Sequence, residues 1–125
     1  MSNYVRRGDS ALMIAQEALK NYNHHTMCVD DICVLVAKAF VCYLCECLRS
    51  HNLQIPRIYK IELLLENLRS NNMTIPNIQE ITANAKLYDT WASYEDDCSY
   101  HLIPLDTVTV AIEYCTQLKY YVHSM

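Results

Sequence analysis

Hydrophobic residues recur along this chain at the spacing of helices. The first set, separated by three or four residues, predicts an amphipathic helix: Leu12, Ala15, Leu19 and Tyr22. This helix could begin after a cap at Asp9 or Ser10. It could also begin earlier, near Asn3, which would place Gly8 inside the helix.

A run of apolar residues dominates the middle of the first half. Within 33–48 only Lys38 and Glu46 carry charge, so the segment is hydrophobic on every side. The run is shorter than the roughly 20 apolar residues of a membrane span. We therefore expect no membrane association but a buried central helix, from about Asp30 to about His51.

Three further helices complete the predicted fold, with a loop from Glu95 to about Ile103. A short helix would share one face among Ile58, Ile61, Leu64, Leu65 and Leu68. A fourth would follow Pro76 and carry Ile81, Ala85, Tyr88 and Ala92, with Leu87 and Trp91 beside them. The last helix carries Val108, Ala111, Ile112, Cys115, Leu118 and Val122, after start signals at Pro104 and Asp106.

Two corners between these helices have nearly the same sequence. Residues 48–58 and 68–78 are identical at seven of eleven positions, with Arg near a helix end, then Asn, then Pro. This order is typical of one helix ending and another beginning. We interpret the match as two helix ends that use similar residues rather than as a small duplication, because no third copy occurs.

Composition supports one all-α domain over 1–125. The chain has 125 residues with one Gly and three Pro, too few turn formers for a protein built of hairpins. We expect an up-and-down bundle of about five helices. No secretory signal is recognised, and the odd number of cysteines, seven, favours free thiols in the cytoplasm.

Charge is distributed unevenly. The net charge is −4, which makes nucleic acid an unlikely partner for the chain as a whole. Residues 1–62 nevertheless carry seven Lys/Arg against six Asp/Glu, whereas 63–125 carry three against eight. Any surface that meets a polyanion is expected in the first half.

Groups that could hold a metal have simpler interpretations. Cys42, Cys45 and Cys47 lie in the predicted central helix, where burial would blunt their reactivity. The other two groups lie in polar loops: His24, His25 and Cys28, and then Glu95, Asp96, Asp97 and His101. We expect core thiols and solvated loops, with no metal and no cofactor.

Aromatic residues gather before and within the acidic loop. Tyr88, Trp91, Tyr94 and Tyr100 cluster there, among ten Tyr and one Trp in the chain. Tyr and Trp are enriched in interfaces. This cluster could cover one end of the bundle or form an interface, and the second interpretation predicts a homodimer.

The order of these elements resembles the HEPN family (higher eukaryotes and prokaryotes nucleotide-binding). Its members are small helical bundles, many of them RNases or the substrate-binding partners of minimal nucleotidyltransferases. The resemblance covers nearly the whole chain: the central helix with Ala37, Ala39 and Leu44, the loop to Pro56, the helix 58–68, the corner 91–97 and the last helix.

This chain departs from the catalytic members of that family. Their RNase motif has an Arg followed four to six residues later by a His. Ser93 stands at the Arg position, and His101 comes eight residues later. Tyr59 replaces the His that usually opens the third helix. Because Ser cannot replace a cationic phosphate contact, metal-independent RNase activity is not expected.

The resemblance therefore implies a non-catalytic binding or accessory module that acts as a homodimer. Its ligand would be a nucleotide, or its partner a minimal nucleotidyltransferase. The expected surface consists of Tyr88, Trp91, Tyr94, Asp96, Asp97 and His101. One alternative is a residual, metal-assisted RNase of toxin–antitoxin type that uses His101 and the acidic loop, and another is an oligomer with no ligand.

Overall fold

The computed structural model describes residues 2–22, 28–94 and 102–125, and within these ranges it contains six helices and no strand. They are α1 (Asn3–Lys20), α2 (Val29–Ser50), α3 (Ile61–Ser70), α4 (Ile78–Ala83), α5 (Ala85–Ser93) and α6 (Leu105–His123). The predicted all-α bundle is confirmed, with one helix more than expected.

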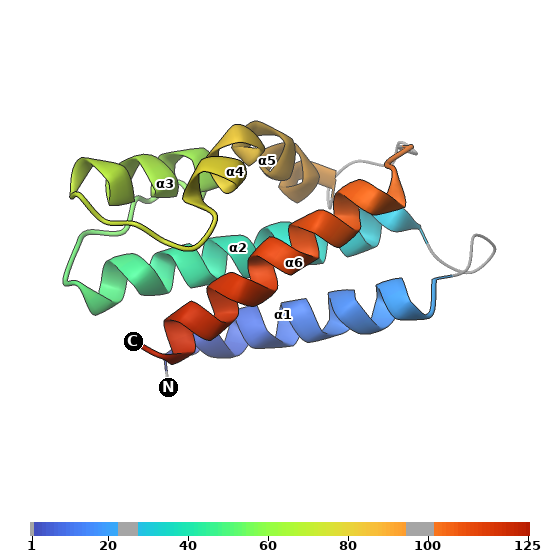
Figure 1. The fold of residues 1–125 in the computed structure, drawn as a ribbon, viewed down its shortest axis with the longest axis horizontal. Coiled ribbons are helices and arrows are strands. Elements are labelled where there is room, and N and C mark those ends of the chain that lie inside the picture. Colours follow the sequence, from blue (N-terminus) through green and yellow to red (C-terminus); the bar gives the residue numbers. More distant parts are fainter. Residues whose placement is uncertain (1, 23–27, 95–101) are drawn as a thin grey trace.

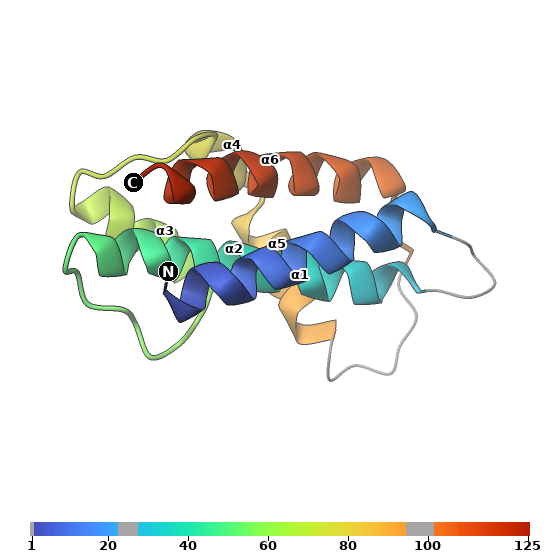
Figure 2. The ribbon, with the colours of Figure 1, turned by 90° about the horizontal axis from the view of Figure 1, so that it is seen from below.

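The central helix of the bundle is α2, as the apolar run predicts. Fifteen of its 22 residues are buried, which requires neighbours around most of its circumference. α1 runs along one side of α2, while α3, α4 and α5 lie on the opposite side (Figure 1). α6 packs against both α1 and α2 (Figure 2). None of the helices in the described ranges combines the length and apolarity needed to cross a membrane.

The predicted fourth helix is two helices that meet at Asn84. The backbone of Asn84 leaves the helical region at φ −108° and ψ 6°. Its side-chain amide donates to the carbonyl of Glu80 at 2.9 Å, and its own carbonyl then accepts from the backbone of Tyr88 at 3.0 Å. Asn side chains compete in this way with the helical ladder. The apolar residues of 81–92 follow one helical period, so the sequence pattern did not reveal that the helix is interrupted.

α3 begins later than its apolar face suggests. Ile58 is 60% exposed and precedes the helix, which starts at Ile61. The carboxylate of Asp89, on α5, accepts hydrogen bonds from the backbone N–H groups of Ile61 at 2.7 Å and Glu62 at 3.2 Å. The helix start is thus capped by a residue from another helix rather than by its own preceding residue.

The two repeated corner sequences, 48–58 and 68–78, end the preceding helices with the same backbone arrangement. Asn52 and Asn72 both adopt φ 57°, the left-handed conformation that Asn tolerates. The following N–H donates in each case to a carbonyl five residues earlier: Leu53 to Leu48 and Met73 to Leu68, both at 2.9 Å. The segments after the prolines differ, because only the second leads directly into a helix.

Candidate functional site

Two aromatic residues that were expected at a binding surface lie in the core. Tyr88 is 2% exposed and Trp91 is 0% exposed. The ring of Tyr88 stacks on Phe40 of α2 with centroids 4.9 Å apart, and Trp91 lies 5.0 Å from Tyr88. These rings pack α5 against the central helix, α2. In this structure neither Tyr88 nor Trp91 can contact a ligand at the surface.

The other expected surface residues are only partly described. Tyr94 is half-buried directly after α5. Asp96, Asp97 and His101 lie outside the described residues, as do His24 and His25. Within the described ranges, no group of three His, Cys, Asp or Glu side chains is placed to hold a metal ion.

A hollow of about 590 Å³ lies beside α4, and a groove that we name the main groove lies between α1 and α2. Its cavity has a volume of about 590 Å³, within the usual range for small-molecule sites. Its floor is apolar and comes from one face of α2: Val34, Ala37, Val41, Cys42 and Cys45. The start of α1 forms one wall, and Tyr59 and Ala92 lie on the opposite side.

Positive charge in the main groove is concentrated on two side chains. Arg7 of α1 and Lys38 of α2 both line it, and both are exposed. In the described part of the chain, neither forms an ion pair with a carboxylate. Burial raises the pKa of the Cys42 thiol in the floor, and the charges of Lys38 and Arg7 partly offset this rise. The positive charges of Arg7 and Lys38 therefore influence a side chain in the floor of the groove.

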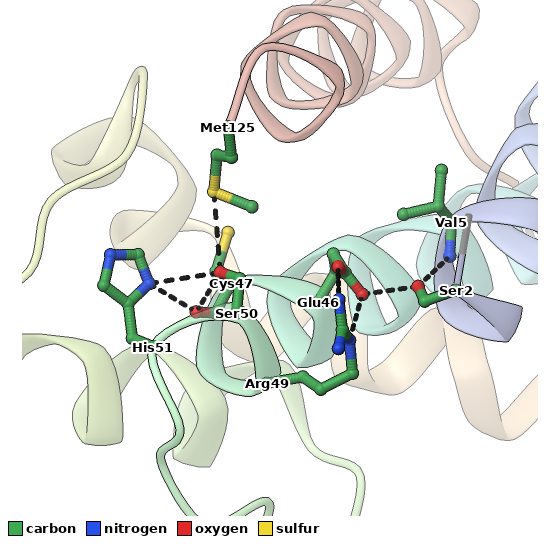
Figure 3. A network of polar contacts seen from close by, with 8 residues as sticks. All are labelled: Ser2, Val5, Glu46, Cys47, Arg49, Ser50, His51 and Met125. Carbon is green, nitrogen blue, oxygen red and sulfur yellow. Dashed lines mark hydrogen bonds and ion pairs between the residues drawn. The ribbon is translucent and has the colours of Figure 1, made fainter.

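A third cation at the groove is neutralised by a buried acid. Arg49 donates to the two carboxylate oxygens of Glu46 at 2.6 and 2.9 Å (Figure 3). The hydroxyl of Ser2 donates to the same carboxylate at 2.5 Å and accepts from the backbone of Val5 at 3.2 Å, which caps α1. This network ties the start of α1 to the end of α2. Among the described residues, Arg7 and Lys38 remain as the cations of the groove that have no carboxylate partner.

The tyrosines of the groove supply rings and hydroxyls. Tyr4, on α1, is half-buried, whereas Tyr59 is 56% exposed. Burial raises the pKa of Tyr4, and a hydrogen bond with the side chain of Tyr59 raises it further. Both tyrosines therefore bring a ring and a hydroxyl to the lining of the groove.

The groove combines an apolar floor with cationic side chains. Its described lining contains no His, Asp or Glu that could act as a general base. Burial raises the pKa of the Cys45 thiol to about 12, so this thiol stays protonated and is a poor nucleophile. An apolar floor beside unpaired cations favours a ligand with an apolar or aromatic body and an anionic group.

The sequence contained one signal for this groove. The excess of Lys and Arg in residues 1–62 indicated the correct half of the chain. Arg7, Lys38 and Tyr59 are distant in sequence, however, and no local motif connects them. Only the packing of α1 on α2 brings the two cations to one surface.

Comparison with known proteins adds no relationship, because no protein family, curated protein or solved structure matches this chain.

Proposed function

We propose that this chain is a non-catalytic HEPN-like binding module that holds a nucleotide in the main groove. The proposal rests on Arg7 and Lys38, which form no ion pair with any described carboxylate and lie beside an apolar floor. A phosphate would lie between these cations, since guanidinium and ammonium groups both bind phosphate through charge-assisted hydrogen bonds.

The rest of the groove suits the base and the sugar. Val34 and Val41, both half-buried, offer an apolar surface for a ring, and Tyr59 offers an aromatic one. Asn3 provides a neutral polar group in the wall, whereas the hydroxyl of Ser2 is already bonded to Glu46 and Val5. Arg49 is already paired with Glu46, so that among the described residues of the lining Arg7 and Lys38 are the cations available to a phosphate.

The proposal includes a protein partner and a compartment. The module forms a homodimer and works with a minimal nucleotidyltransferase, as in the family that the helix order resembles. Exposed apolar side chains such as Leu102 (88%) and Tyr120 (66%) offer surface for such contacts. The compartment is the cytoplasm, which fits the free cysteines of the described chain. Light scattering, alone and with a nucleotidyltransferase, tests the assembly.

Calorimetric titration tests the nucleotide site directly. AMP, ATP, adenosine and inorganic phosphate are titrated into the wild type and into the Arg7→Ala and Lys38→Ala variants. Each variant should bind AMP at least about tenfold more weakly, because each loses a charge-assisted hydrogen bond. Lys20→Ala is the matched control, since Lys20 is an exposed cation at the far end of α1. Absence of AMP binding to the wild type at millimolar concentration would contradict the proposal.

The enzymatic alternative has a separate test. A residual RNase would use His101 and the acidic loop, which lie outside the described residues. RNA is incubated with the wild type, with and without EDTA, and with His101→Ala. Cleavage that is lost with EDTA and in the variant would support the RNase over the binding module.

A further inference from the structure

A second hollow adjoins the main groove across the same two cations. This outer hollow has a volume of about 360 Å³ and lies on the outer surface of α1 and α2. Arg7 and Lys38 line both the main groove and the outer hollow. The cations therefore stand between two concave surfaces, rather than at the closed end of one.

The two concave surfaces differ in chemistry. The main groove has aromatic and neutral polar side chains, among them Tyr4, Tyr59 and Asn3. The outer hollow has a third cation, Arg6, and is otherwise aliphatic: Ala11 and Ile14 come from α1 and Leu35 from α2, with Ser10 at the edge. Ile14 is 51% exposed, so its side chain has apolar area that a ligand could cover.

This arrangement constrains where a ligand carries its charge. A fatty acid or a free nucleotide has its anionic group at one end, so it could occupy only one of the two surfaces. A phosphodiester has a substituent on each side of the charged phosphorus and two unesterified oxygens. It could place one oxygen towards Arg7 and the other towards Lys38.

We propose that the ligand is a nucleoside monophosphate ester that carries an aliphatic arm. The nucleoside lies in the main groove, the phosphate lies between Arg7 and Lys38, and the arm covers Ile14 and Leu35. This inference rests on the proposed nucleotide site and adds the chemical class of its ligand.

Two esters of AMP with equal charge test the arm. The hexyl and methyl esters each carry one negative charge and differ only in the length of the aliphatic group. In calorimetric titration the wild type should bind the hexyl ester at least about tenfold more tightly, because burial of methylene groups is favourable. Equal affinity for the two esters would overturn the inference.

Two exposed residues on α1 provide the matched variants. Ile14→Ser should remove most of the preference for the hexyl ester, since Ile14 lines the outer hollow. Met13→Ser should retain it, because Met13 is 58% exposed and lines neither surface. Circular dichroism checks that both variants fold. A preference that persists unchanged in Ile14→Ser would also overturn the inference.

Failure of the proposed nucleotide site can be distinguished from failure of the proposed aliphatic arm. If neither ester nor AMP binds to the wild type, both the proposed function and this inference are wrong. If AMP binds with the expected dependence on Arg7 and Lys38 but the hexyl ester binds no better than the methyl ester, only the aliphatic arm is wrong.

Discussion

The hydroxyl of Tyr43 on α2 donates a hydrogen bond of 2.6 Å to Oδ1 of Asp9 on α1. Nε2 of His123 on α6 lies 2.8 Å from Oδ2 of the same carboxylate. One acidic side chain therefore connects three helices. Burial raises the pKa of Tyr43, and the hydrogen bond to Asp9 raises it further, so the hydroxyl remains a donor.

Removal of the Asp9 carboxylate should destabilise the bundle. Asp9→Ala leaves the hydroxyl of the buried Tyr43 without its partner, which costs about 1–3 kcal/mol. Tyr43→Phe should cost about 1 kcal/mol, and the double variant less than the sum of the two. Urea unfolding measures each value. Glu113→Ala, an exposed acid on α6, is the control. An Asp9→Ala protein as stable as the wild type would refute the role of this bond.

Gly8 should not tolerate even an added methyl group. A Cβ at Gly8 would lie 2.7 Å from Cε1 and 3.0 Å from Cζ of Tyr43. In a free helix Gly→Ala would gain about 1 kcal/mol, but overpacking against the ring costs about 1–3 kcal/mol. Thermal unfolding should therefore show a lower Tm for Gly8→Ala. In a Tyr43→Leu background the same change should be neutral or stabilising, and a loss of equal size there would argue against the contact.

Trp91 should contribute to folding rather than to direct binding. Trp91→Ala removes a fully buried ring and should cost about 3–5 kcal/mol, seen as a lower urea midpoint. Tyr94→Ala, on a half-buried residue, should cost less than that. The sequence alone placed Trp91 and Tyr94 on the expected binding surface, where their substitution would abolish binding and leave helicity intact. Unchanged stability of Trp91→Ala would restore that expectation.

Glu46 should make stability depend on acidic pH. Hydrogen bonds from Arg49 lower the pKa of Glu46 against the opposing effect of burial, and the bond from Ser2 lowers it further. As pH falls through roughly 4–5, the usual range for Glu, the unfolded chain takes up a proton before the folded protein does. The stabilising contribution of Glu46 is thus present at neutral pH and lost in acid.

Glu46→Gln isolates this effect. The variant should be about 1–3 kcal/mol less stable at neutral pH, because hydrogen bonds to a charged group are lost. Urea midpoints of variant and wild type should converge as pH is lowered. Glu113→Gln, which changes an exposed acid, should leave the pH profile unchanged. A constant difference between Glu46→Gln and wild type at every pH would contradict the assigned pKa shift.

The buried thiols should resist alkylation in the folded protein. Burial raises the pKa values of Cys33, Cys45 and Cys47 to about 12, so almost none is thiolate at mildly alkaline pH. In a Cys28→Ser/Cys98→Ser variant, iodoacetamide should label thiols rapidly only after urea is added, as mass spectrometry would show. Rapid labelling without urea would mean that the core opens readily.

Local patterns in the sequence identified most of the helices. The apolar stripe over residues 108–122 lies on the buried side of α6, with all six of its members in the core. The all-round apolarity of 33–48 placed α2 at the centre, and the repeated Asn residues marked two helix ends. Such signals are local, because helix periodicity and end residues act within a few positions of the chain.

The groove between α1 and α2 could not be predicted from such local patterns. Enrichment of Tyr and Trp suggested an interface around residues 88–101, whereas Tyr88 and Trp91 pack into the core. An amphipathic pattern shows which residues share a face but does not distinguish a face packed on the same chain from one that meets a partner.

The sequence by itself determined the helical class, the central position of 33–48 and the excess of positive charge in the first half. Tertiary structure alone decided the break at Asn84, the cap that Asp89 gives to α3, and the meeting of Arg7 with Lys38. The physical reason is that helix formation depends on neighbours three or four residues apart. The groove instead depends on how α1 and α2 pack, which brings together side chains that no local pattern connects.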